Sequence, residues 1–416
     1  MMVLPHRSAR DALARIATGT HIVSAPGMGA PTTLLAEIGE LAPGRGWTLS
    51  SGLLLGDYPF LPAVVDGDLT YRTWHVMAPV RGLVADGTVG YVPARASRLA
   101  GLLSRWEIGA ALVRISPPDA HGYSSLGPSV GYGLAALRTA GTLIAEIDPA
   151  VPRTCGESCV HISVFDSLVE SATALPHYSS AKPHPTSTRI AEHVLPLLPK
   201  EPTLQIGIGA VPETLVRSLK DADLGGVRFV GMATDEMVDL FEAGVLRRRE
   251  VVPAPAVLSP EMMGTERLLS FGHGNPSIGM YPSSVSHDSG RLGDIERFVS
   301  VNTAIEVDLY GNVNSEVVAG RQISGPGGSL DYIDTAARSR GGLRIVALPS
   351  ASSDGSVSRI VPSLGTVTIP RSMVDVVVTE QGVARLDGLT TRERARALLA
   401  IAHPDHQQAL GEAVAL

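Results

Sequence analysis

The stretch TLQIGIGAVPETLV, residues 203–216, determines the fold class of this chain of 416 residues. Four residues typical of a buried strand lead into a Gly-x-Gly-Ala turn, and a proline follows in the first turn of a predicted helix. The same order occurs about 180 residues earlier, where HIVS (21–24) precedes GMGAP (27–31) and a helical segment from Thr32. The chain therefore repeats a strand–turn–helix unit.

A second pair of segments supports this duplication. ISPPDAHGYSS (115–125) and IEVDLYGNVN (305–314) each carry Asp-x-x-Gly, and each precedes an apolar strand, LIAEI (143–147) or LRIVAL (343–348). The Pro-, Ser- and His-rich segment 177–185 is typical of a linker. We therefore predict two similar α/β domains, 1–185 and 186–416, each with an open, largely parallel sheet covered by helices. Ligands of such folds bind beyond the carboxyl ends of the strands, and two such domains create a cleft between them.

Composition argues against several classes of protein. A formal net charge of −7 and 4% aromatic residues argue against a nucleic-acid partner. Two cysteines form no disulfide framework, and the twelve histidines show no metal-ligating spacing, so we expect no metal. The sequence has neither a signal-peptide pattern nor an apolar run of membrane-spanning length, so we expect a soluble, cytoplasmic protein with no membrane partner.

Two glycine-rich segments are candidate binding sites. The amides of Gly207, Ile208 and Gly209 could point at an anion or a developing oxyanion, or the turn could simply need a positive φ. Neither copy of the turn completes the dinucleotide fingerprint, because Thr32 and Pro212 take the place of its third glycine. The loop SGPGGSLDY (324–332), with Gly325, Gly327 and Gly328, could let a ligand approach the backbone or could be a flexible surface loop.

Carboxylates give a weaker signal, because most of them are solvated surface groups. Asp235 and Glu236 begin an amphipathic helical run, and we expect Asp235 to cap that helix. The chain has no G-x-S-x-G motif of a serine hydrolase.

Several longer sequence motifs, taken together, are specific enough to indicate a protein family. They are SPPDxHGYxSLG (116–127), PRTxGES (152–158), AIEVDL (304–309), SGxGG (324–328), VTExGVA (378–384) and IAHP (401–404). With them the chain resembles the acetyl-CoA hydrolase/transferase family, which includes 4-hydroxybutyrate CoA-transferases, over almost its whole length. The resemblance implies two homologous CoA-transferase-type (NagB/RpiA-like) α/β domains, the second carrying the CoA-site glycine loops. It also implies a homodimer, coenzyme A in the interdomain cleft and no permanently bound cofactor.

The resemblance also implies a mechanism. Members of the family use a glutamate carboxylate to attack an acyl-CoA thioester, and CoA thiolate then returns to give a glutamyl-CoA thioester. A small acceptor carboxylate takes the CoA, or water hydrolyses the intermediate. By this likeness Ile208 and Gly209, with Gly327 and Gly328, stabilise the oxyanion.

The sequence departs from the family pattern at the nucleophile. The family strand reads His-Ser/Thr-Glu-Met-x-x-Asp-Gly-Val-Val-Asp-Leu, and residues 229–240 here read FVGMATDEMVDL. Alignment on Asp235, Asp239 and Leu240 places Gly231 in the glutamate slot, with Glu236 five residues further on. At ~3.3 Å per residue Glu236 is displaced from that slot. The family's nucleophile is therefore expected to be absent.

Three interpretations follow. In the first, the chain transfers or hydrolyses an acyl group of a CoA thioester without the glutamyl route, with Glu236, Asp235 or His121 as candidates for activating water. In the second, it is a conventional CoA-transferase or hydrolase with a relocated carboxylate. In the third, it is a catalytically silent homologue that binds CoA. Loss of the glutamate enlarges the pocket and removes a negative charge, which favours the first.

Overall fold

A computed structural model describes residues 6–246 and 255–413 of the chain. Its contacts cluster into two compact units. The first unit holds residues 6–179, 255–286 and 321–327, and the second holds 180–246, 287–320 and 328–413. Two late segments thus belong with the N-terminal part of the chain, which the repeat does not indicate. The predicted boundary near residue 186 stays a prediction.

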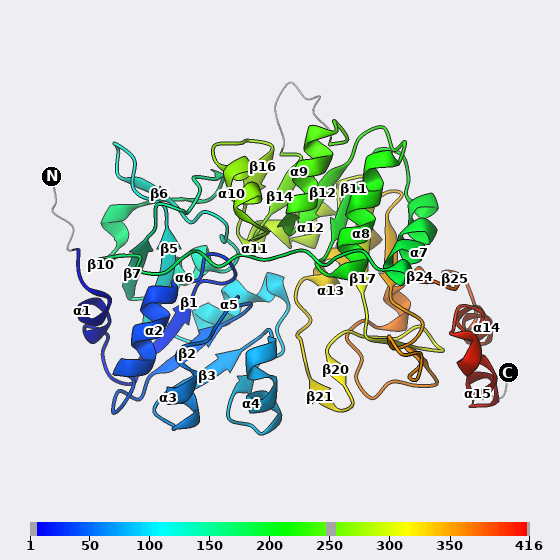
Figure 1. The fold of residues 1–416 in the computed structure, drawn as a ribbon, viewed down its shortest axis with the longest axis horizontal. Helices are drawn as coiled ribbons and strands as arrows, with labels where there is room; N and C mark the ends of the chain where they lie inside the picture. The colour runs from blue at the N-terminus through cyan, green and yellow to red at the C-terminus, as the bar shows by residue number, and fades with distance from the viewer. Residues whose placement is uncertain (1–5, 247–254, 414–416) are drawn as a thin grey trace. The chain divides into compact units, whose positions relative to one another are not determined.

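The first unit is built on a seven-stranded sheet in the order β10-β7-β5-β1-β2-β3-β4, and each paired strand runs parallel to its neighbour (Figure 1). The interior strand β5 is buried along its whole length, as expected where helices cover both faces. The strands are β1 (His21–Ser24), β2 (Thr48–Ser51), β3 (Thr70–Thr73), β4 (Gly90–Tyr91), β5 (Ala110–Ile115), β7 (Thr142–Ile147) and β10 (Ser167–Glu170). The helices between them are α1 (Ala9–Ala14), α2 (Thr32–Leu41), α3 (Leu61–Val65), α4 (Arg81–Ala85), α5 (Leu99–Arg105) and α6 (Gly133–Thr139).

The second unit contributes six consecutive sheet strands in the order β25-β24-β22-β17-β11-β12. The pairs are parallel except β24–β25, which is antiparallel. The strands are β11 (Thr203–Ile206), β12 (Arg228–Gly231), β17 (Phe298–Thr303), β22 (Leu343–Ala347), β24 (Val376–Thr379) and β25 (Gly382–Arg385). The helices are α7 (Pro185–Val194), α8 (Ala210–Ser218), α9 (Asp235–Glu242), α12 (Ser289–Leu292), α13 (Ser329–Arg338), α14 (Thr391–Ala400) and α15 (Pro404–Ala413).

Shorter elements complete both units. The first unit adds β6 (Tyr123–Ser125), β8 (Cys155–Gly156), β9 (Cys159–His161), β14 (Val257–Ser259), β15 (Met262–Met263), α10 (Glu266–Gly272), β16 (Ile278–Met280), α11 (Ser283–Ser286) and β21 (Arg321–Gln322). The second adds β13 (Ala233–Thr234), β18 (Glu306–Asp308), β19 (Val313–Asn314), β20 (Val317–Val318) and β23 (Ile360–Val361). No helix in the described ranges has the length and apolar composition needed to cross a membrane.

The two units share one topology, as the repeat predicts. The orders β10-β7-β5-β1-β2 and β24-β22-β17-β11-β12 place successive strands of the chain in the same spatial sequence. The two Asp-x-x-Gly turns also agree in detail. Each aspartate Oδ1, of Asp119 or Asp308, accepts the N–H groups of the residues two and four positions later. The turn glycines Gly122 and Gly311 have φ of +84° and +92°. The predicted fold class is confirmed.

One local prediction is wrong. Helix α9 begins at Asp235, and its N-cap is Thr234, whose backbone is extended. Asp235 therefore occupies the first helical position instead of the cap. A carboxylate there still interacts favourably with the positive end of the helix dipole, which explains why the sequence pattern placed it at a helix start.

Candidate functional site

The predicted glutamate slot lies at the carboxyl end of β12. Gly231 is the last residue of that strand and pairs in register with Ile206, the last residue of β11. The Gly207–Gly209 turn follows Ile206 directly, so the turn and Gly231 lie at the ends of neighbouring parallel strands. This edge of a parallel sheet is where such folds bind ligands.

The backbone at Gly231 has a conformation that favours glycine. Its φ is +115°, a value that side-chain-bearing residues rarely adopt. A Cβ built there would lie 3.6 Å from Gln205 Cγ and 3.8 Å from the Tyr332 hydroxyl oxygen, which are ordinary contact distances. A Cβ would therefore fit in contact with these neighbours, but the backbone conformation is one that residues with a Cβ rarely adopt.

A buried tyrosine on α13 is directed at this slot. Tyr332 is 3% exposed, and its hydroxyl has no hydrogen-bond partner among the described residues. Its ring packs on His287, with centroids 4.6 Å apart, and stacks with Phe298 at 6.4 Å. Burial raises the pKa of Tyr332 well above 10 and lowers the pKa of His287 to about 3. Near neutral pH the slot therefore faces a neutral phenol held by a neutral imidazole.

The other wall of the slot is a buried amide network. Gln205 Oε1 accepts hydrogen bonds from Ser300 Oγ at 2.8 Å and from Asn302 Nδ2 at 3.3 Å. Asn302 Nδ2 also donates to Ser300 Oγ at 2.7 Å. These three side chains come from adjacent strands β11 and β17 and hold Gln205 in place beside Gly231.

The Gly207–Gly209 turn has free space around its glycines, but one of its amides is already hydrogen-bonded within the protein. A Cβ at Gly207 or Gly209 would meet nothing within 4 Å, and Gly209 has a φ of +109°. The Gly209 N–H donates to Glu213 Oε1 at 3.0 Å, and the other oxygen of Glu213 accepts the Ala181 N–H at 2.6 Å. The Gly209 amide thus already donates within the chain, and the amides of Gly207 and Ile208 remain the oxyanion candidates of this turn.

Glu236 is engaged in an ion pair. Its side chain is 4% exposed, and Oε1 lies 2.6 Å from Nη2 of Arg217 on α8. A buried carboxylate needs such a partner, because an unpaired charge is costly to bury. This ion pair supports a structural role for Glu236 in the α8–α9 packing, and its other oxygen, Oε2, has no hydrogen-bond partner among the described residues.

The second glycine loop divides between the two units. Gly328 belongs to the second unit, and a Cβ there would come within 2.4 Å of His287 Nε2, so glycine lets the start of α13 approach that ring. In the first unit, a Cβ at Gly325 would lie 2.3 Å from the Trp74 carbonyl oxygen. Gly327 has a φ of +53° and its carbonyl accepts the Ala96 N–H at 2.9 Å. Backbone packing therefore explains the glycine at 325.

His121 lies on the exposed Asp119 turn of the first unit. Its N–H donates to Asp119 Oδ1 at 2.9 Å, and its carbonyl lies 3.1 Å from His161 Nε2. Among the predicted site residues, the structure thus groups Gly207, Ile208, Gly209, Gly231, Asp235, Glu236 and Gly328 in the second unit, and His121, Gly325 and Gly327 in the first.

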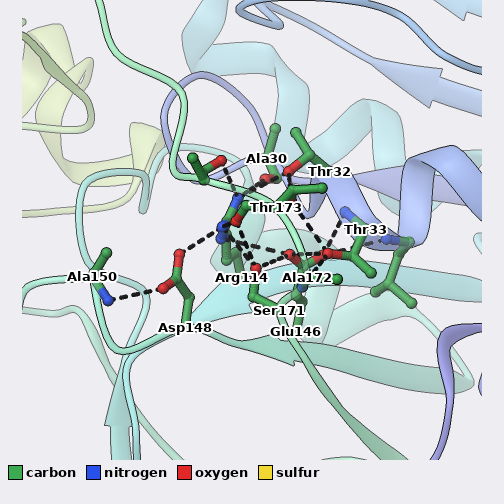
Figure 2. Close-up of polar contacts among 12 residues, drawn as sticks. Ala30, Thr32, Thr33, Arg114, Glu146, Asp148, Ala150, Ser171, Ala172 and Thr173 are labelled. Carbon is green, nitrogen blue, oxygen red and sulfur yellow. Dashed lines mark hydrogen bonds and ion pairs between the residues drawn. The ribbon is translucent and has the colours of Figure 1, made fainter.

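The first copy of the glycine turn is closed by the protein's own charges (Figure 2). Glu146 Oε2 accepts the N–H groups of Thr33 at 3.0 Å and Leu34 at 3.3 Å, in the first turn of α2. Arg114 lies between Glu146 and Asp148, with Nε–Oε1 and Nη2–Oδ2 distances of 3.6 and 2.6 Å, and its side chain and that of Glu146 are fully buried. The helix N-terminus at which a Rossmann fold binds pyrophosphate here binds an internal carboxylate.

Sequence reasoning missed a second unusual carboxyl group, Glu261. Its carboxyl group lies beside Gly27, in the first unit's glycine turn, and beside Gly131. A Cβ built on Gly27 would be 3.3 Å from Glu261 Oε2, and a Cβ built on Gly131 would be 2.3 Å from Glu261 Oε1. Burial raises the pKa of Glu261 to about 8, against a smaller lowering by the Ser129 hydroxyl. Oε2 has no hydrogen-bond partner within the described part of the chain. The available signal was an acid inside the apolar run VLSPEMMG (257–264).

Comparison with known proteins supplies the family. The acetyl-CoA hydrolase/transferase N-terminal domain matches residues 47–175, and the C-terminal domain of the same family matches residues 264–414. The 4-hydroxybutyrate coenzyme A transferase of Clostridium kluyveri is 33% identical over 410 residues, covering 97% of this chain and 95% of that protein.

Solved structures agree. RipA from Yersinia pestis superposes with a TM-score of 0.90 at 29% identity, over 98% of this chain and 96% of that one. The 4-hydroxybutyrate CoA-transferase of Porphyromonas gingivalis gives a TM-score of 0.79 at 29% identity, with the same coverage. The chain therefore belongs to the acetyl-CoA hydrolase/transferase family of enzymes.

Proposed function

We propose that this chain transfers or hydrolyses the acyl group of a CoA thioester without a glutamyl-CoA intermediate at position 231. The observation that carries the proposal is the backbone of Gly231, whose φ of +115° suits glycine. A side chain at this position would need a backbone conformation that residues with a Cβ rarely adopt, which supports a site that works without a carboxylate there.

The chemistry is a direct displacement at the thioester carbon. An acceptor hydroxyl, or water, attacks the carbonyl carbon, and the carbonyl electron pair moves to oxygen. Collapse of the tetrahedral intermediate breaks the carbon–sulfur bond, and the departing CoA thiolate takes up the proton that the attacking group loses. The amides of Gly207 and Ile208 are the proposed backbone donors to the oxyanion.

The proposed bases differ in what their surroundings allow. Glu236 is paired with Arg217, which favours a structural role. Asp235 and His121 stay candidates for activating water, Asp235 at the start of α9 and His121 on an exposed turn. Alanine substitution of each, with hydrolysis followed across pH, ranks them.

The test separates the three interpretations. The purified chain is incubated with acetyl-, butyryl- and succinyl-CoA, with and without acetate, while free thiol and new CoA esters are followed. Thiol release, with no protein adduct trapped by borohydride or hydroxylamine, supports the proposal. CoA exchange onto acetate through a trapped glutamyl-CoA contradicts it. Binding of CoA without turnover would identify a silent homologue.

Glu261 supports a second candidate function, a conventional CoA-transferase or hydrolase with a relocated carboxylate. A buried carboxyl group with an unpartnered oxygen and a pKa raised to about 8 is typical of functional sites. Peptide mapping after trapping distinguishes the candidates, because an adduct on the peptide that contains Glu261 would establish the second.

We also propose a homodimer that uses acyl-CoA and a small acceptor and needs no bound cofactor. The family resemblance supports this assembly. Light scattering on a sizing column tests it, and a mass near that of one chain would exclude it.

A further inference from the structure

Tyr332 is a buried polar group whose hydroxyl has no hydrogen-bond partner among the described residues. Its hydroxyl oxygen would lie 3.8 Å from a Cβ on Gly231. Leaving a buried hydroxyl unpaired is destabilising, so a phenylalanine would pack there at lower cost. Retention of the hydroxyl therefore needs a reason outside the fold.

The first unit shows what a purely structural tyrosine looks like. Tyr132 precedes α6, and its hydroxyl accepts the Gly52 N–H at 2.9 Å and donates to the Ser24 carbonyl at 2.9 Å. Gly52 directly follows β2, the strand that corresponds to β12 in the repeat. In the second unit the hydroxyl of Tyr332 lies beside the end of the corresponding strand but has no hydrogen-bond partner in the described part of the chain.

Neighbouring side chains determine the orientation of the Tyr332 ring. Its ring lies against His287 and Phe298, with ring centroids 4.6 and 6.4 Å away. Gly328 allows this packing, since a Cβ there would be 2.9 Å from Tyr332 Cε2. The packed ring therefore places the hydroxyl oxygen beside Gly231, 3.8 Å from a Cβ built there, as a preorganised donor requires.

We propose that Tyr332 is a catalytic residue that donates its hydroxyl hydrogen to the carbonyl oxygen of an acyl group bound in the Gly231 slot. This inference rests on the proposed function. In it, Tyr332 contacts the substrate at the slot where the family pattern has a carboxylate. As the acceptor or water adds to the thioester carbon, the electron pair moves to this oxygen and the hydrogen bond strengthens. The proton stays on Tyr332, because burial keeps the phenol neutral. The thiolate then leaves as described above.

The kinetic test compares Tyr332→Phe with Tyr71→Phe. Tyr71 is 1% exposed and its hydroxyl is bonded to Ser51 Oγ at 2.7 Å, so it is a matched structural tyrosine. We expect Tyr332→Phe to lower kcat about 100-fold with KM for acyl-CoA unchanged, while its melting temperature stays equal or rises. Tyr71→Phe should lower the melting temperature and leave kcat unchanged. A Tyr332→Phe variant with wild-type kcat would overturn the proposal.

A second measurement does not depend on turnover. A ketone analogue of acetyl-CoA, with methylene in place of sulfur and ¹³C at the carbonyl, is bound to the wild type and to Tyr332→Phe. The proposal predicts a downfield carbonyl resonance in the wild type that moves back upfield in the variant. Such a difference in a protein that turns over no acyl-CoA would refute the proposed function and leave the Tyr332 contact standing. Equal resonances, or an analogue that binds neither protein, would overturn the Tyr332 proposal even if the enzyme is active.

Discussion

Gly231 combines room for a Cβ with a backbone conformation that residues with a Cβ rarely adopt. Its φ of +115° disfavours any residue with a Cβ, although its nearest neighbours, Gln205 and Tyr332, leave ordinary contact distances. The sequence predicts that Gly231 occupies the position of the family nucleophile, and its backbone conformation would hinder a glutamate there. At the residue scale, the backbone of Gly231 and the buried carboxyl group of Glu261 each lead to a prediction about stability.

We expect Gly231→Ala to lower the free energy of unfolding by about 1–2 kcal/mol, the cost of forcing a side chain into a left-handed backbone. Gly207→Ala is the control, because nothing lies within 4 Å of its Cβ and its φ is not in that range. Urea unfolding of the two variants measures the difference. Equal destabilisation of both would contradict the backbone argument.

Glu261 should make stability depend on pH. Its pKa is about 8 in the folded protein against 4.5 for a free glutamate, so the folded state keeps a proton that the unfolded state loses. Stability is therefore lost as pH rises from about 4.5 to about 8, by about 5 kcal/mol. Glu261→Gln should gain stability over the wild type progressively across this range. Urea unfolding at pH 5, 6.5 and 8 tests this, and a constant difference between the two proteins would refute it.

At the scale of elements, the two strand–turn–helix units use their helix starts differently. The first turn of α2 binds Glu146, which also pairs with Arg114, whereas the turn before α8 donates its Gly209 amide to Glu213. The sequence predicts both turns and both helices, because the Gly-x-Gly-Ala pattern and the prolines are local. It does not predict which carboxylate occupies each turn, since Glu146 lies 113 residues from Thr33.

We predict that Glu146→Gln destabilises the first unit by about 3–5 kcal/mol, because it leaves the buried Arg114 charge with one carboxylate fewer. Glu296→Gln is the matched control. Glu296 pairs with Arg340 on the surface, where the side chains are 50% and 81% exposed, and its loss should cost less than about 1 kcal/mol. Thermal unfolding measures both, and a similar small loss in both variants would show that the buried cluster contributes little.

At the scale of the whole molecule, the repeat predicts the duplicated topology, and the structure shows Gly231 at the end of β12. The strand orders of the two units agree because the same pattern of apolar strands and turns occurs twice in the sequence. The association of segment 255–286 with the first unit was beyond sequence reasoning, and so was Glu261 within it. The sequence also did not reveal the Tyr332 hydroxyl, which has no partner among residues 6–246 and 255–413, because its position beside Gly231 depends on tertiary structure.

The most direct test of the account is the mass of the intact protein during turnover. The chain is mixed with acetyl-CoA, quenched with acid while free CoA is accumulating, and analysed by mass spectrometry. The account predicts that CoA is released while the protein keeps its unmodified mass at every time point. A transient protein species heavier by CoA, located on a carboxylate and formed as fast as turnover, would contradict it.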